Sequence, residues 1–224
     1  MDKNDKFQIA EQRKEELLVL ISSYVTRVFS RQLKKEDEKI EERLMRLEKF
    51  KEDVSILDLR SGRGWLLNKL FSCGYRKLFG IDVDRIRIRE SNYAINTVNI
   101  DNKDSNEAIA TKIMFNQDCF GYDFLRKEYF DVVIVTNMLT YIKDLKSFIQ
   151  QVSALIRAGG IIIITNPNSG GSVGFKTNRN GYPIFNLEDL MNLPFSDKFI
   201  LKEHYSKMLF KKYDQSFVIF EKTL

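Results

Sequence analysis

Two acids and two glycines in the first third of the sequence have the types and spacing of a nucleotide site. Asp58 ends the apolar run Val54-Ser55-Ile56-Leu57, and Gly62 and Gly64 follow it. Glycine lets the backbone approach a ligand because no Cβ stands in the way, and free N–H groups at the next helix start can bind an anion. Asp82 ends a second apolar run 24 residues after Asp58, where a carboxylate can accept both ribose hydroxyls. These residues predict that a nucleotide-like ligand binds here.

The spacing of the glycines distinguishes between kinds of nucleotide loop. A dinucleotide loop needs a third glycine three residues after the second, and that residue is Leu67. The stretch Asp58-Leu59-Arg60-Ser61-Gly62-Arg63-Gly64 instead resembles the first motif of class I S-adenosylmethionine-dependent methyltransferases, D-x-G-x-G-x-G. Arg60 stands at the first glycine. The resemblance implies S-adenosylmethionine as cofactor, with contacts from Asp58, Arg60, Ser61, Gly62 and Gly64.

Two later stretches extend the resemblance. Gly80-Ile81-Asp82 matches the second motif, and Val83 after it is then expected against the adenine. Asn116-Gln117-Asp118-Cys119 matches the third motif, in which Asp118 accepts a hydrogen bond from the adenine amine and the Cys119 N–H donates to the ring. An ordinary loop acid is the alternative for each residue alone. Three acids at the ends of three successive strands favour the cofactor interpretation.

The fourth motif points to the chemistry. Residues 130–142 are similar to small-molecule methyltransferases of the ubiquinone-biosynthesis type, which often carry Glu and His where this chain has Asn137, Thr140 and Tyr141. The resemblance places Thr136 and Asn137 at the cofactor. The departure from its pattern removes the likeliest metal ligands and the usual candidate base, so no metal site is expected. Because a phenol is a weak base at neutral pH, Tyr141 is interpreted, with Asn137, as a positioning group. Methyl transfer needs a general base only for a poorly acidic acceptor.

The acceptor is expected to lie under a long loop. Residues 166–183 show no periodicity and are rich in Asn, Gly and Ser, and long structureless loops in compact domains are usually functional or disordered. The hypothesis is that this loop and the N-terminal helix close over a small anionic or polyhydroxylated acceptor. The candidate acceptor-binding residues are Tyr24, Arg27, Tyr141, Asn168, Lys176, Arg179 and Tyr182.

The order of elements predicts an α/β class: a Rossmann-like, doubly wound, mostly parallel seven-stranded sheet with an N-terminal helical extension. Residues 1–53 form the extension, as lid or packing helices, and residues 54–224 form the S-adenosylmethionine-binding domain. Apolar periodicity predicts helices over residues 7–33, from 36 onward, and over 65–71, 84–99, 145–157 and 187–193. Strands are predicted at 54–58, 77–82, 111–116, 131–135, 161–165 after a glycine turn at 158–160, 199–210 and 215–221.

The composition limits the classes of function that the chain can have. No apolar run in the 224 residues is long enough to cross a membrane, and the two cysteines favour a reducing cytoplasm. The net charge of +5 is compatible with nucleic acid and with a phosphorylated or carboxylated small substrate. The leading prediction is methyl transfer to O or N of a small molecule. Two alternatives stay open: an RNA or protein methyltransferase, and a catalytically degenerate relative, which Arg60 in the first motif would support. The sequence predicts neither the acceptor nor the oligomeric state.

Overall fold

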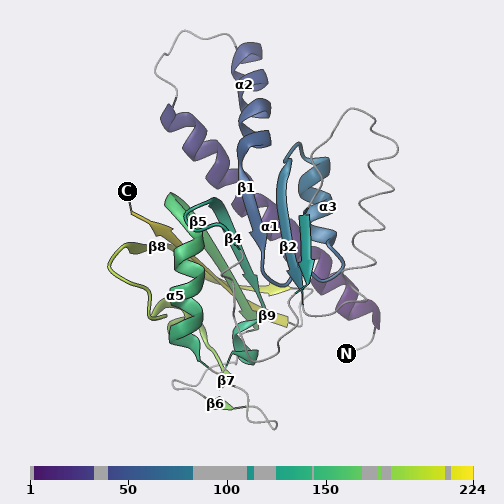
Figure 1. Ribbon diagram of the computed structural model, residues 1–224. Helices are drawn as coiled ribbons and strands as arrows, with labels where there is room; N and C mark the ends of the chain where they lie inside the picture. Colours follow the sequence, from purple (N-terminus) through teal and green to yellow (C-terminus); the bar gives the residue numbers. More distant parts are fainter. Residues whose placement is uncertain are drawn as a thin grey trace. The chain divides into compact units, whose positions relative to one another are not determined.

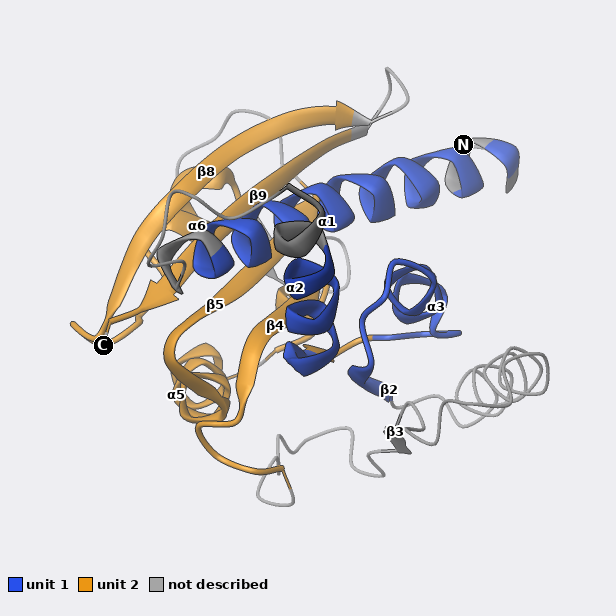
Figure 2. Ribbon diagram, turned by 90° about the horizontal axis from the view of Figure 1, so that it is seen from above, with its two compact units in different colours: residues 1–56, 61–113 blue, residues 57–60, 114–224 orange. Residues whose placement is uncertain are grey.

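The structure is a computed structural model that describes residues 3–32, 40–82, 110–113, 125–142, 144–167, 176–177, 183–209 and 213–223 (Figure 1). The chain divides into two compact units, coloured separately in Figure 2. The first contains residues 1–56 and 61–113, and the second contains residues 57–60 and 114–224. Strand β1 (Ser55–Asp58) therefore begins in the first unit and ends in the second.

The first unit contains most of the helical extension and the first loop. Its helices are α1 (Lys3–Gln32), α2 (Ile40–Asp53) and α3 (Trp65–Ser72), and its strands after β1 are β2 (Lys77–Asp82) and β3 (Ala110–Ile113). The predicted apolar stripe of α1 is confirmed, since Leu17, Ile21 and Tyr24 are buried. Strand β2 runs parallel to β3, and α3 packs on β2. The predicted helix at 84–99 lies outside the described residues.

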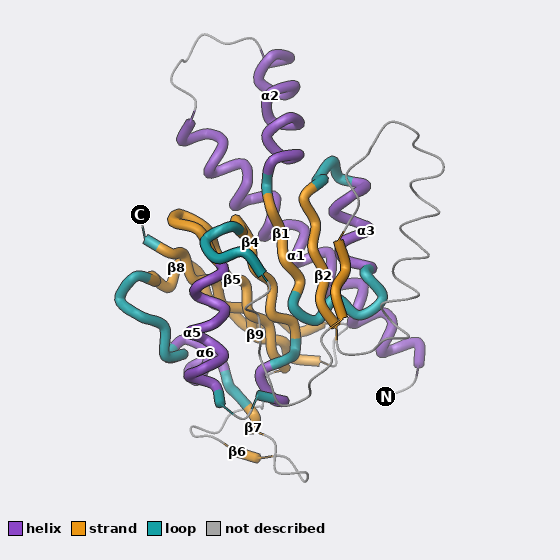
Figure 3. The backbone as a smooth tube through the Cα atoms, in the orientation of Figure 1, coloured by secondary structure: helices purple, strands orange, loops and turns teal. Residues whose placement is uncertain are grey.

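The second unit holds the remaining described elements. In chain order these are β4 (Phe130–Thr136), the 3₁₀ turn η2 (Leu139–Tyr141), α5 (Leu145–Leu155), β5 (Ile156–Pro167), β6 (Lys176–Thr177), β7 (Pro183–Ile184), α6 (Leu187–Met191), β8 (Phe199–Leu209) and β9 (Tyr213–Lys222) (Figure 3). Strands β4 and β5 are parallel, whereas β9 pairs antiparallel with both β5 and β8. Helix α5 packs on β4 and β5, and α6 packs on β8 and β9.

The strands form one sheet in the order β3-β2-β1-β4-β5-β9-β8, which confirms the predicted seven-stranded α/β sheet. Residues 132–135 of β4 and 161–164 of β5 are at most 1% exposed. Parallel strands that are covered on both faces carry such unbroken apolar runs, so the sequence signal for these two strands was strong.

The glycine turn predicted at 158–160 is wrong, because this segment belongs to β5. Helix α5 ends at Leu155, and β5 starts at once with Ile156 opposite Phe130 before the register shifts to Ile161 opposite Val132. Gly159 allows the shift with a φ of +74°, a left-handed value that glycine adopts readily.

The stretch 166–183 also departs from the prediction of a structureless loop. Strand β5 continues to Pro167, and β6 and β7 form a two-stranded antiparallel ribbon in which Lys176 pairs with Ile184. Two-residue strands are too short to show an apolar alternation, which explains why β6 and β7 were not predicted.

Candidate active site

The first loop, residues 61–64, is tied to the end of β2 by backbone groups. The N–H of Ser61 donates to the Ile81 carbonyl oxygen at 3.0 Å, and the N–H of Gly62 donates to Oδ2 of Asp82 at 2.9 Å. Gly62 and Gly64 have φ values of +56° and +71°, which L-residues rarely adopt. A Cβ on Gly62 would meet nothing within 4 Å. The loop therefore needs glycine for its conformation, and open space adjoins Gly62.

Strand β2 packs closely under this loop at Gly80. A Cβ at Gly80 would lie 2.7 Å from Cδ1 of Leu67 and 2.8 Å from both Cβ and Oγ of Ser61. Only a residue without a side chain fits at these distances. Gly80, which the sequence marked only as part of a motif, fixes the height of the loop above β2.

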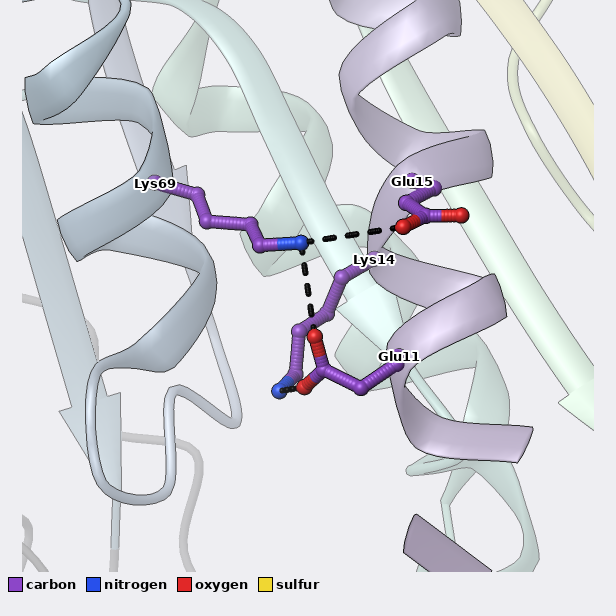
Figure 4. Close-up of polar contacts among 4 residues, drawn as sticks. All are labelled: Glu11, Lys14, Glu15 and Lys69. Carbon is purple, nitrogen blue, oxygen red and sulfur yellow. Dashed lines mark hydrogen bonds and ion pairs between the residues drawn. The ribbon is translucent and has the colours of Figure 1, made fainter. Parts of the chain in front are cut away.

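Helix α1 contacts the start of α3 directly after the loop. Trp65, the first residue of α3, meets the Phe7 ring edge-on with centroids 6.3 Å apart, and the Lys14 ammonium lies 4.0 Å from the Trp65 ring centroid. Lys69 forms ion pairs with Glu11 at 3.3 Å and Glu15 at 4.0 Å (Figure 4). These contacts join the N-terminal half of α1 to the helix that begins at the loop.

The same contacts perturb one carboxyl group. The hydrogen bond from Lys14 holds the pKa of Glu11 below its ordinary value, and Lys69 acts in the same direction against partial burial. Elsewhere in this unit, burial raises the pKa of the Tyr75 phenol. Tyr75 lies inside the helical packing and offers no chemistry to the loop.

In the second unit, Arg60 contacts the turn after β4. Its guanidinium donates a hydrogen bond to the backbone carbonyl oxygen of Asn137 and lies 4.7 Å over the ring centroid of Tyr141. The Arg60 N–H donates to Oδ1 of Asp58, which is buried, at 3.3 Å. The structure thus brings together Asp58, Arg60, Asn137 and Tyr141, and their roles at the cofactor and the acceptor stay predictions.

Asn137 is held in a strained conformation by two neighbouring strands. Its φ of +50° is left-handed, its N–H donates to the Thr165 carbonyl oxygen at 2.8 Å, and its Oδ1 accepts from Nε2 of Gln215 at 3.0 Å. Sequence reasoning missed Gln215. Its signal was available: Gln215 and Ser216 are a polar pair at the head of the apolar run of β9, and both are fully buried.

Three buried polar atoms lie at the carboxyl ends of β4 and β5, on both faces of the sheet, because successive side chains of a strand point to opposite faces. In the part of the chain that the structure describes, the hydroxyls of Thr136 and Thr165 and Oδ1 of Asn166 have no hydrogen-bond partner. Thr136 lies opposite Thr165 in the register of the two strands. Buried polar groups are normally hydrogen-bonded, so these three atoms are suited to a ligand or water.

The remaining predicted residues fall into three groups. Tyr24 is buried and Arg27 is exposed on α1, with the guanidinium 5.8 Å from the Tyr24 ring centroid; their acceptor role stays a prediction. Lys176 lies in β6, whose partner β7 contacts η2, the turn that carries Tyr141. The others lie outside the described residues: Val83, Asp118, Cys119, Asn168, Arg179 and Tyr182.

The described residues contain neither a cluster of metal-ligating side chains nor a membrane-spanning helix. Among them, no group of three or more His, Cys, Asp and Glu side chains could hold a metal ion. Within the same residues, no helix is long and apolar enough to cross a membrane.

A sheet of this order with a glycine loop after its first strand defines a nucleotide-binding α/β protein. The sequence matches the methyltransferase-domain family over residues 30–207. The chain belongs to this family, and with this fold it is a class I S-adenosylmethionine-dependent methyltransferase. No curated protein matches it in sequence.

Solved structures share the fold at low sequence identity. An S-adenosylmethionine-dependent methyltransferase from Mesorhizobium loti is similar with a TM-score of 0.58 at 12% identity, over 76% of this chain and 91% of the other. One from Aquifex aeolicus gives 0.53 at 10% identity, over 80% and 88%. The [4+2]-cyclase SpnF gives 0.61 at 11% identity, over 84% and 85%. At these identities the likeness concerns the fold alone.

Proposed function

We propose that this protein transfers the methyl group of S-adenosylmethionine to an oxygen or nitrogen of a small-molecule acceptor. The observation that carries the proposal is the hydrogen bond of 2.9 Å from the Gly62 N–H to the Asp82 carboxylate, with open space beside Gly62. It sets the end of β2 and the first loop in the arrangement that a nucleoside needs, an acid for the ribose beside an exposed backbone.

The cofactor roles follow from the first loop and the ends of the strands. The Gly62 N–H fixes the orientation of the Asp82 carboxylate, which then accepts hydrogen bonds from the ribose hydroxyls. Gly64 ends the loop at the first turn of α3, where backbone N–H groups can meet polar groups of the ligand. The roles proposed for Val83, Asp118 and Cys119 at the adenine rest on the motifs.

When bound, S-adenosylmethionine supplies an electrophilic methyl group on a positively charged sulfur. What the chain contributes is positioning, because holding the two reacting atoms in line at contact distance removes most of the entropic barrier. Asn137 and Tyr141 are the positioning groups proposed for the acceptor. Both are weak bases, so the proposed acceptor is an amine or hydroxyl that loses its proton to solvent.

The orphan polar atoms at the ends of β4 and β5 support a small acceptor. The hydroxyls of Thr136 and Thr165, which lie opposite each other in the register of the two strands, are buried, and a hydroxyl oxygen there can accept a hydrogen bond from an acceptor N–H or O–H. A compact ligand can reach buried atoms of this kind, whereas an RNA or protein surface reaches exposed ones. We therefore favour a small molecule over a macromolecular acceptor.

Calorimetry with S-adenosylhomocysteine tests the cofactor site. We expect the wild-type protein to bind it and Asp82→Ala to weaken binding by about 1–3 kcal/mol, because ribose hydroxyls lose their partner. Asp53→Ala is the control: Asp53 is an exposed acid of the same unit that pairs with Lys77 at 2.8 Å. Equal affinity of wild type and Asp82→Ala would contradict the role of Asp82.

Methyl transfer needs its own assay, since SpnF, a structure of similar fold, is named as a cyclase. Transfer of labelled methyl from S-adenosylmethionine to a panel of small amines and alcohols, with RNA and protein as comparison acceptors, is expected to label small molecules. Cofactor binding with no labelled product in any class would favour the catalytically degenerate alternative.

A further inference from the structure

Arg60 is the residue of the first motif that the family pattern does not explain. It stands where that motif has glycine, directly after Asp58 and Leu59, both of which are buried. The Arg60 side chain extends to the turn after β4, where its guanidinium meets the Asn137 carbonyl oxygen and the Tyr141 ring. An arginine that only pointed to water would make neither contact.

The charge of Arg60 is not balanced within the described residues. There, its guanidinium contacts one carbonyl oxygen and one aromatic face, and no carboxylate forms an ion pair with it. Asp58, the nearest acid in the sequence, accepts from the Arg60 backbone N–H. A guanidinium has five N–H donors, and a partly buried charge is costly unless it is paired. The geometry therefore suits an added anion.

The contact with Tyr141 favours a planar anion. A guanidinium stacked on an aromatic ring has its plane fixed, so that its edge can form two parallel hydrogen bonds to a carboxylate. The Tyr141 side chain is 56% exposed, so a ligand can reach the pair from solvent. Lysine would offer the charge without the plane or the paired donors.

We propose that Arg60 and Tyr141 form a binding site for a carboxylate group of the reactants, which rests on the proposed function. Two reactants can supply this group, namely the amino-acid end of S-adenosylmethionine and an acidic acceptor. The sequence assigned anion binding to Lys176 and Arg179, whereas the described contacts assign it to Arg60.

The first experiment compares two ligands that differ in the carboxylate. S-Adenosylhomocysteine carries the amino-acid end, and 5′-methylthioadenosine lacks it. If the donor supplies the carboxylate, Arg60→Gln weakens S-adenosylhomocysteine binding about tenfold to hundredfold and leaves methylthioadenosine unchanged. A purely structural role of Arg60, through its hydrogen bond to the Asn137 carbonyl oxygen, would change the affinities for both ligands by the same factor or leave both unchanged.

The second experiment uses acetate as the probe, with and without S-adenosylhomocysteine, and acetamide as its neutral control. If the acceptor supplies the carboxylate, acetate but not acetamide shifts the NMR signal of the Arg60 Nε–H, which is assigned by its loss in Arg60→Gln. Tyr141→Leu should weaken the binding of S-adenosylhomocysteine in the first case, and of acetate in the second, severalfold. Because acetate titration does not require cofactor binding, it separates this inference from the proposed function. The inference is overturned if acetate and acetamide act alike and Arg60→Gln binds S-adenosylhomocysteine as wild type does.

Discussion

The first loop and the turn after β4 are stabilised by different kinds of groups. The loop is held by backbone N–H groups, with Ser61 bonded to Ile81 and Gly62 bonded to Asp82. The turn depends on side chains as well as on the backbone bond from Asn137 to Thr165, with Arg60 and Gln215 both bonded to Asn137. A backbone arrangement of this kind depends on where glycines stand, whereas the side-chain arrangement depends on which residues occur at distant positions. The two regions should therefore respond differently to substitution.

The largest expected effect concerns Gly80, where β2 packs closely under the loop. Gly80→Ala places a Cβ within 2.8 Å of Leu67 and Ser61, and should lower the free energy of unfolding by about 1–3 kcal/mol through overpacking. It should also lower affinity for S-adenosylhomocysteine, because Ser61 must move. Denaturant unfolding and calorimetry measure the two effects.

Gly160→Ala is the matched control in the second unit. Its Cβ would lie 2.9 Å from the Asp131 carbonyl oxygen and 3.0 Å from that of Phe130, so a similar stability loss is expected. The residue lies at the bulge of β5 and its Cβ would meet no atom of the first loop, so the cofactor affinity of the folded protein should be unchanged. A parallel loss of affinity in both variants would mean that the loop has no special dependence on Gly80.

A smaller effect is expected where side chains hold the turn. Gln215→Leu removes the donor to Oδ1 of Asn137 and should lower the free energy of unfolding by about 1 kcal/mol. Because Asn137 then loses its orientation, methyl transfer should slow while affinity for methylthioadenosine stays the same. Ser206→Ala on β8 is the control, because it removes the hydroxyl that hydrogen-bonds to Ser216 on β9. If Gln215→Leu turned over at the wild-type rate, Gln215 would be only a packing residue.

What could be predicted from the sequence follows the same division. The motif Asp58 to Gly64 and the acid Asp82 identified the loop and its partner, because backbone conformation is encoded locally by glycine. The hydrogen bonds of Asn137 join residues 77 and 78 positions apart in the sequence, and no local pattern specifies such pairs. Gln215 and Ser216 stand out in the sequence as a polar pair, but no local pattern shows that Gln215 bonds to Asn137.

The same reason explains the wrong prediction at β5 and the contacts of α1 that were not predicted. The stretch Ala158-Gly159-Gly160 has the composition of a turn, but pairing of Ile156 with Phe130 makes it a bulge. The apolar stripe of α1 predicted that the helix packs, and not that Glu11 and Lys14 face the start of α3. Tertiary contacts decided both outcomes.

The smallest expected effect concerns the contact between α1 and α3. This contact lies in the same unit as the first loop, but it is formed by side chains. The hydrogen bond from Lys14 depresses the pKa of Glu11 in the folded protein, so its stabilisation is present above the unfolded-state pKa and is lost as pH falls through the folded one. Trp65 is the only tryptophan and lies 4.0 Å from the Lys14 ammonium, so its fluorescence reports on the contact. Below about pH 4.5, acidification should change Trp65 emission in the wild type before far-UV circular dichroism changes.

Glu11→Gln should show the acid form's emission at neutral pH and no further change on mild acidification. Glu15→Gln, whose oxygen lies at 4.0 Å from Lys69, should titrate as wild type does. The cost in unfolding free energy should stay below about 1 kcal/mol, because partly exposed ion pairs are screened by water. An identical titration in Glu11→Gln would show that an acid other than Glu11 controls the contact between α1 and α3.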